Sequence, residues 1–154
     1  MKPFVSTFFI VLFIGQLGWS QKGIEGLWEG EMTLGGIYSH QTVKFEMLLQ
    51  RKGKQVFGKS LIHINENEII QMEVSGYFYM DNSVYMNDIK FIPMVGENED
   101  MIPPYYRKYQ FIFDRSIWES KIDGYWQEIK GESFDPSRER GRISLKKIKK
   151  KAKA

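Results

Sequence analysis

The two histidines, His40 and His63, are the only imidazoles of the chain, and there is no cysteine. A catalytic zinc ion normally needs three protein ligands, and no carboxylate stands at ligand spacing beside either histidine. His63 falls within a run that alternates as a strand does, so we expect it on a strand surface. The sequence therefore predicts no metal site, and the lack of cysteine excludes disulfides, thiol nucleophiles and thiolate ligands.

Serines and carboxylates give no stronger sign of catalysis. Residues 58–62 (GKSLI) lack the second glycine of a nucleophile elbow, and the acidic run 97–100 lacks the ligand spacing of a calcium loop. Paired carboxylates can hydrolyse glycosides; the candidates are Glu29 with Glu31 and Asp123 with Glu128. Carboxylates that alternate along an amphipathic strand are ordinarily solvated. We predict a non-catalytic protein with no catalytic residue and no cofactor.

The N-terminal residues 1–20 have the three parts of a secretory signal. Lys2 supplies the positive charge, residues 4–17 are mostly apolar, and Gly18 and Ser20 are small residues at −3 and −1 of a cleavage site. We expect the mature chain to begin at Gln21, with an uncleaved anchor as the alternative. Export without any cysteine favours the periplasm or exterior of a Gram-negative bacterium.

The charge of the chain is unevenly distributed. Six lysines stand in the last nine residues, 146–154, whereas the preceding residues 21–145 are mildly acidic. A nucleic-acid-binding domain should carry its basic residues on a folded face, so we expect no nucleic-acid partner. At 154 residues with 42% hydrophobic content, the chain is expected to form one domain over 21–145, followed by a basic tail over 146–154.

Period-two alternation of apolar and polar residues dominates the predicted domain and indicates an all-β fold. The predicted strands cover residues 27–34, 42–51, 55–65, 68–80, 84–92, 108–114, 117–129 and 141–148. Within 84–92 we expect Tyr85, Asn87, Ile89 and Phe91 to share a face, and within 117–129 the large apolar residues are Trp118, Ile122 and Trp126. Short links make this an antiparallel meander of about eight strands, which closes into a barrel or remains an open sandwich. Gly30, Gly58, Gly76 and Gly124 fit the sharp coiling of a small barrel.

The segment Gly26-Leu27-Trp28 opens the first predicted strand and resembles the Gly-x-Trp signature of lipocalins and the wider calycin group. This resemblance implies a barrel whose tryptophan closes one end, beneath a basic residue from the last strand. Arg142 is the best match for that residue and Arg140 the second. A guanidinium over an indole contributes about 0.5–2 kcal/mol.

The remaining signal is the apolar volume inside such a barrel. If Trp28 faces inward, alternation places a set of large side chains on the inner face: Met32, Phe45, Met47, Met72, Phe78, Phe111 and Trp126. Methionine and aromatic walls suit adaptable apolar ligands, and they equally suit a filled core. We therefore expect a monomeric, lipocalin-like module that binds a small hydrophobic molecule. The alternative is an envelope protein that docks on an anionic surface through its lysine-rich tail.

Overall fold

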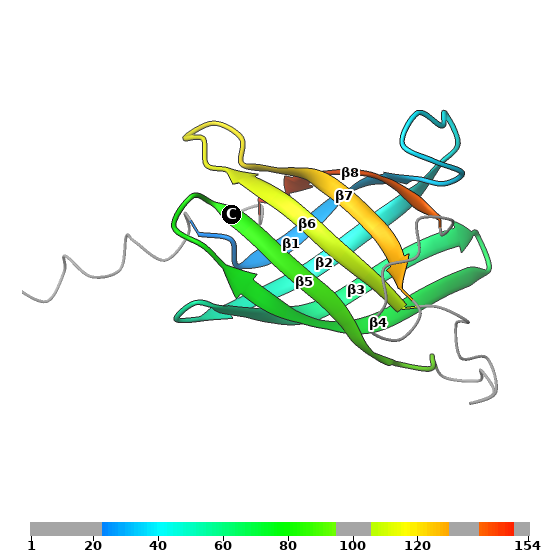
Figure 1. Ribbon diagram of the computed structural model, residues 1–154, viewed down its shortest axis with the longest axis horizontal. Helices are drawn as coiled ribbons and strands as arrows, with labels where there is room; N and C mark the ends of the chain where they lie inside the picture. The colour runs from blue at the N-terminus through cyan, green and yellow to red at the C-terminus, as the bar shows by residue number, and fades with distance from the viewer. Residues whose placement is uncertain (1–22, 95–105, 130–138, 150–154) are drawn as a thin grey trace, which may run out of the picture.

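The computed structural model describes residues 23–94, 106–129 and 139–149, and within these ranges the chain forms eight β-strands. They are β1 (Gly26–Thr33), β2 (Thr42–Lys52), β3 (Gln55–Asn65), β4 (Glu68–Phe78), β5 (Ser83–Phe91), β6 (Tyr106–Asp114), β7 (Lys121–Ile129) and β8 (Arg140–Lys147). Figure 1 shows them lying obliquely around one long axis. No helix in the described ranges is long and apolar enough to cross a membrane.

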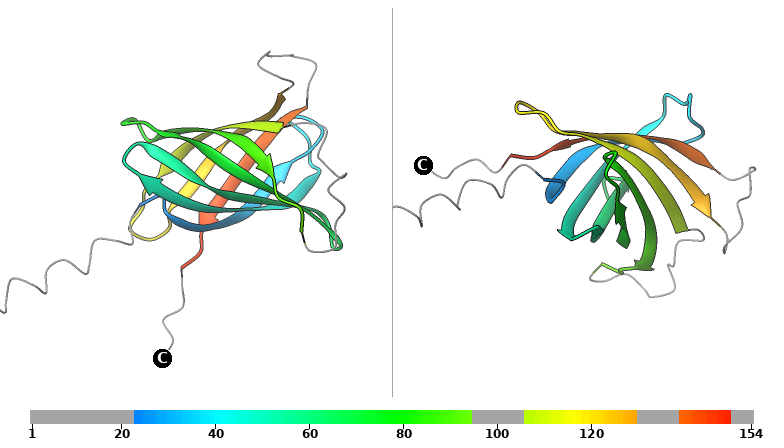
Figure 2. Two further views of the ribbon diagram at one scale, coloured as in Figure 1. Left: turned by 90° about the horizontal axis from the view of Figure 1, so that it is seen from below. Right: turned by 60° about the vertical axis from the view of Figure 1, so that its left-hand side comes forward.

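Each strand pairs antiparallel with the next one along the chain, and β8 also pairs with β1. The last pairing closes the sheet into a barrel, and Figure 2 shows β8 beside β1. The predicted all-β meander of eight strands is confirmed, and the open sandwich is wrong because both edge strands are paired. Closure leaves no exposed sheet edge.

The barrel has two ends, which we name after the tryptophan nearest to each. The Trp28 end carries the turn at 79–82, the loop at 115–120 and the chain that leaves β8. These segments lie toward the left of Figure 1. The Trp126 end carries the loop at 34–41 and the turn between β3 and β4.

Four inward-facing glycines allow the strands to approach one another closely, as the sequence predicts. They are Gly30, Gly58, Gly76 and Gly124. A Cβ atom added to Gly76 would overlap the carbonyl oxygen of Tyr85 on β5, which is backbone and cannot swing aside. Glycine is thus required for the tight coiling of these strands.

Alternation places the core residues inside the barrel in most strands. In β6, Phe111 is buried on the predicted inner face, and Tyr109 and Phe113 are buried on the same face. The face predicted for residues 84–92 is wrong: Tyr85, Asn87 and Ile89 are exposed, whereas Phe91 packs against the core.

The cause is a register shift in β5 opposite Glu73 and Val74, which pair with Lys90 and Asp88 respectively. The extra residue, Ile89, reverses the alternation, so Phe91 turns inward and Lys90 stays exposed. The strand predicted over 117–129 begins later, at Lys121. Trp118 therefore lies in the preceding loop and is 81% exposed.

Candidate functional site

The inner wall of the barrel contains a group of polar side chains near the Trp126 end. Strand β6 contributes Arg107 and Tyr109, β5 contributes Asp88 and β3 contributes Ser60, and all four are buried. With Trp126 of β7 they form what we call the polar cluster. Burying a polar side chain costs free energy unless the side chain is hydrogen-bonded. The hydrogen-bond partners of each member are therefore described in turn.

Asp88 is the buried carboxylate of the cluster. Its Oδ2 atom accepts a hydrogen bond of 2.8 Å from the backbone N–H of Arg107, and its Oδ1 atom accepts one of 3.0 Å from the Tyr109 hydroxyl. Burial raises the pKa of Asp88 to about 6, although both hydrogen bonds and the charge of Arg107 act in the opposite direction. Burial, with the nearby Asp88 charge, also raises the pKa of Tyr109, so its hydroxyl remains a donor.

Arg107 is the buried cation of the cluster. Its guanidinium carbon lies 5.2 Å from the centre of a Trp126 ring, within the range of a cation–π contact. The Nε and Nη1 atoms of Arg107 are buried and have no hydrogen-bond partner among the described residues. Two donors of one charged group therefore remain available inside the barrel.

Ser60 adds a third unpartnered polar atom. It lies close enough to Tyr109 to lower the pKa of that phenol slightly against the larger effect of burial. The Ser60 Oγ atom nevertheless has no hydrogen-bond partner of good geometry in the part of the chain that the structure describes. Serine can donate or accept, so the cluster contains three buried polar atoms without hydrogen-bond partners in the described chain, and one of them can also accept.

Apolar side chains surround the polar cluster. Of the seven residues that the sequence predicts for the inner face, Met32, Phe45, Met47, Met72, Phe111 and Trp126 are all buried. Phe45 stacks on Tyr109 and Tyr109 on Phe111, with ring centres 5.9 and 5.7 Å apart. Phe78 is half-buried and lies at the Trp28 end, where it contacts Phe113. Six of the seven are thus inside the barrel, where Phe45 and Phe111 contact the polar cluster directly, and Phe78 lies at the Trp28 end.

The Trp28 end is built from fully partnered groups. Trp28 is buried, and its indole Nε1–H donates a 2.8 Å hydrogen bond to the carbonyl oxygen of Ile24. The ring meets Phe113 edge-on, with centres 5.9 Å apart. Lys147 of β8 places its Nζ atom 5.8 Å from the ring centre and donates to the carbonyl oxygen of Gly23.

The sequence predicts Arg142 as the basic residue over Trp28, and this prediction is wrong. Arg142 is exposed on the outer face, because Gly141, Ile143 and Leu145 take the inward positions of β8. Arg140 shares that outward parity and is also exposed. Lys147 continues the inward series and supplies the cation over Trp28.

The outer wall carries the remaining candidates of the sequence. His63 Nε2 lies 2.6 Å from Glu46 Oε2 and Lys44 Nζ lies 3.0 Å from Glu46 Oε1, in a surface ion-pair group. Partial burial raises the pKa of Glu46, but the hydrogen bonds from His63 and Lys44 outweigh it, so the pKa is lowered. The described residues hold no group of three or more side chains able to bind a metal ion. The acidic run 97–100 lies outside the described residues.

A hollow of about 490 Å³ also lies on the outer wall, over β1, β2 and β8. Its lining includes Glu29, Lys44 and Lys146, of which Lys44 and Glu29 pair with each other at 3.8 Å. These are solvated side chains with partners nearby, so the hollow offers weaker binding chemistry than the polar cluster.

Sequence reasoning missed Ser60, Asp88, Arg107 and Tyr109 as members of one site. One signal was present: Arg107 stands at the same parity as Tyr109, Phe111 and Phe113, so an inward strand face begins with a charged residue. Asp88 gave a similar signal, because it stands at the same parity as Val84 and Met86, but the face predicted for residues 84–92 took the other parity.

No protein-family model matches the chain, and no curated protein or solved structure matches it at a significant level.

Proposed function

We propose that this chain is an exported, non-catalytic, lipocalin-like module that binds a small and largely apolar molecule inside the barrel. One observation carries the proposal: Arg107 Nε, Arg107 Nη1 and Ser60 Oγ are buried without partners within the described chain. Each buried polar group left unpaired costs about 1–3 kcal/mol, and more where the group is charged. A bound molecule that accepts these hydrogen bonds would remove that cost.

The surroundings define the chemistry of the ligand. Methionine and aromatic side chains such as Met47, Met72 and Phe111 form an adaptable apolar wall. The polar cluster supplies donors at one point, so the ligand should have an apolar body and one hydrogen-bond acceptor. Asp88 lies beside Arg107 and offsets its charge, which favours a weakly anionic or neutral acceptor over a multiply charged one.

Export remains part of the proposal. The tripartite pattern of residues 1–20 and the absence of cysteine support a cleaved signal and a final location in the periplasm or outside a Gram-negative cell. A monomeric carrier with a closed sheet also needs no partner strand.

Native mass spectrometry of mildly purified protein tests the proposal. We expect the intact protein to carry a reproducible adduct, which dissociates as a small molecule at higher collision energy. Arg107→Gln should lose most of the adduct, because the substituted side chain cannot supply the same charged donors. Arg142→Gln is the matched control, since Arg142 is exposed on the outer face, and should keep it.

Two outcomes would overturn the proposal. An intact protein that carries no adduct after gentle isolation would indicate a filled core. An adduct retained equally by Arg107→Gln and Arg142→Gln would place the molecule elsewhere on the chain.

A further inference from the structure

The loop between β6 and β7 exposes apolar side chains at the Trp28 end of the barrel. Ile117 is 80% exposed and Trp118 is 81% exposed. The neighbouring turn between β4 and β5 exposes Met80 to 97%. The two segments lie side by side, because the carbonyl oxygen of Asn82 accepts a hydrogen bond from the backbone N–H of Phe113. Large apolar side chains so fully exposed cost free energy in water unless another phase covers them.

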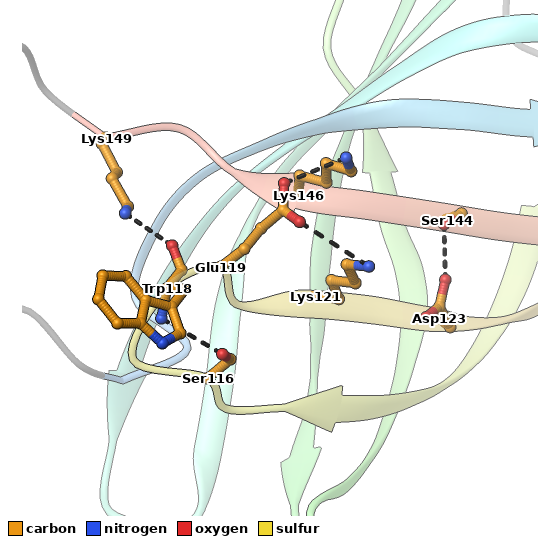
Figure 3. Close-up of polar contacts among 8 residues, drawn as sticks. All are labelled: Ser116, Trp118, Glu119, Lys121, Asp123, Ser144, Lys146 and Lys149. Atoms are coloured by element: carbon orange, nitrogen blue, oxygen red, sulfur yellow. Dashed lines mark hydrogen bonds and ion pairs between the residues drawn. The ribbon is translucent and has the colours of Figure 1, made fainter.

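Hydrogen bonds hold this loop in its exposed position. Lys149 Nζ donates to the carbonyl oxygen of Trp118 at 2.7 Å, and Lys146 Nζ pairs with Glu119 at 3.1 Å. The other Glu119 oxygen lies 3.8 Å from Lys121 Nζ. Figure 3 shows these lysines around the base of the loop, with the Trp118 ring directed away from the barrel. These contacts anchor the loop to β8 and to the residues that follow it, with the Trp118 side chain directed outward.

Positive charge surrounds the same loop. The cations nearest to it in the fold are Arg115, Lys121, Lys146 and Lys149. Three more lysines, at 150, 151 and 153, follow in the sequence. The described carboxylates at this end are Glu25, Asp81, Asp114 and Glu119. Three of them are already engaged: Glu119 pairs with lysines, Asp81 accepts hydrogen bonds from Ser83, and Glu25 accepts one from the backbone N–H of Arg51. At the opposite end the described turns carry the carboxylates Glu66, Glu68 and Glu139.

We propose that the Trp28 end of the barrel docks on an anionic lipid bilayer, with Ile117, Trp118 and Met80 entering the interfacial layer. Tryptophan favours the membrane–water interface, and each lysine near an anionic surface contributes about 1 kcal/mol. The sequence alone indicates only an electrostatic tail. The structure adds exposed apolar side chains at the tips of two loops. These side chains would enter the interfacial layer of a bilayer to which the lysines attract the protein.

A bilayer fits these tips better than a folded partner does. A stable protein–protein interface buries roughly 800 Å² on each partner, whereas the most exposed apolar side chains at this end, Ile117, Trp118 and Met80, stand at the tips of two loops. A soluble anionic polysaccharide would engage the lysines and would leave Ile117 and Trp118 in water. The inference concerns the outer end of the barrel, and it goes beyond the proposed ligand site inside it.

Vesicle binding tests the inference on the chain from residue 21 to 154. This chain keeps every described residue and omits the apolar N-terminal segment, whose own affinity for lipid would obscure the result. The probe is a phosphatidylcholine vesicle with about 30 mol% phosphatidylglycerol, which supplies the anionic surface potential. Trp28 and Trp126 are buried, so Trp118 is the exposed indole of this chain. We expect brominated lipid to quench Trp118 emission and pure phosphatidylcholine vesicles to bind far more weakly.

Two variants separate the apolar and the electrostatic contributions. Ile117→Ser with Trp118→Ser should weaken binding about tenfold or more, because the inserted surface is lost. Replacing Lys150, Lys151 and Lys153 by glutamine should weaken binding about a hundredfold and reduce its sensitivity to salt. Tyr38→Ser is the matched control: Tyr38 is 91% exposed but lies at the opposite end, so binding should not change. All three variants alter exposed or terminal residues, and circular dichroism verifies that each retains the fold.

Several results would overturn the inference. These are a lack of binding to anionic vesicles at low salt, binding without quenching by brominated lipid, and equal binding by the Ile117/Trp118 variant. Binding to a soluble anionic polysaccharide that exceeds vesicle binding and ignores Trp118 would also overturn it, in favour of an electrostatic tail alone. None of these results bears on the adduct retained inside the barrel.

Discussion

The two tryptophans that face into the barrel make similar contacts, but the side chains around them differ. Trp28 and Trp126 are both buried, and each donates its indole N–H to a backbone carbonyl, at 2.8 and 3.0 Å respectively. Each also has a cation over its ring, Lys147 in one case and Arg107 in the other.

The difference lies in the partners of the two cations. Lys147 reaches the carbonyl oxygen of Gly23 and is partly exposed. Arg107 is buried with two unpartnered nitrogen atoms in the described chain, next to a buried carboxylate whose pKa is raised. An end that only closes the barrel requires each of its buried polar groups to have a hydrogen-bond partner. The Trp126 end has buried polar atoms without hydrogen-bond partners in the described chain, which supports the proposal that the ligand binds at that end.

The largest expected effect is on the structural end. Trp28→Ala should lower the free energy of unfolding by about 3–5 kcal/mol, because it removes a fully buried indole. Chemical denaturation measures the change, and the small-molecule adduct should persist under native conditions. A loss below about 1 kcal/mol would show that Trp28 does not close the barrel.

The next effect concerns the buried guanidinium. In protein freed of small molecules, Arg107→Met should raise the free energy of unfolding at pH 5 by about 1–2 kcal/mol, since it removes a buried charge that lacks partners. The same denaturation experiment measures it. A decrease of similar size would mean that the folded chain satisfies Arg107 and needs no ligand there.

The buried carboxylate should make stability depend on pH. Burial raises the pKa of Asp88 from its ordinary 3.8 to about 6, so the folded chain binds this proton more tightly than the unfolded chain does. The resulting stabilisation is present at low pH and is lost as pH rises through about 6.

Between about pH 5 and pH 7 the wild-type chain should lose roughly 1 kcal/mol more stability than Asp88→Asn does. Urea denaturation of both proteins at the two pH values gives this difference. Parallel pH profiles would show that Asp88 titrates normally and is not in an apolar site.

The smallest effect distinguishes the two basic residues of β8. Lys147→Met should cost about 0.5–1 kcal/mol, because the methylene packing survives and the cation–π contact does not. Arg142→Gln, on the outer face, should change stability by less than about 0.5 kcal/mol. Thermal denaturation of the two variants side by side measures this; a larger cost for Arg142→Gln would restore the pairing that the sequence predicts.

Much of the fold follows from period-two alternation. The limits of β3 match the predicted 55–65, and Phe45 and Met47 of β2 and Phe111 of β6 are buried on the inner face as predicted. The same parity argument, applied to Ile143 and Leu145, would have put Arg142 outside and Lys147 inside. Family resemblance drew attention to the arginine instead.

Other features depend on contacts between strands that no single segment encodes. The shift at Ile89 is a property of the β4–β5 pair, so the inward turn of Phe91 could not be predicted from residues 84–92 alone. The late start of β7 is similar: its ladders with β6 and β8 begin only at Lys121, so residues 117–120 belong to the loop. The polar cluster combines residues of the neighbouring strands β5, β6 and β7 with Ser60 of β3, which does not pair with any of these three strands.

The most direct test of the contrast between the two ends is a ¹H–¹⁵N spectrum of the indole and guanidinium N–H groups, recorded before and after solvent extraction of the mildly purified protein. We predict that extraction moves the Trp126 Nε1–H and Arg107 Nε–H resonances and leaves Trp28 Nε1–H in place, because the proposed ligand would contact only the Trp126 end. A spectrum in which none of these resonances moves, or in which Trp28 moves as far as Trp126, would contradict the assignment of binding to the Trp126 end.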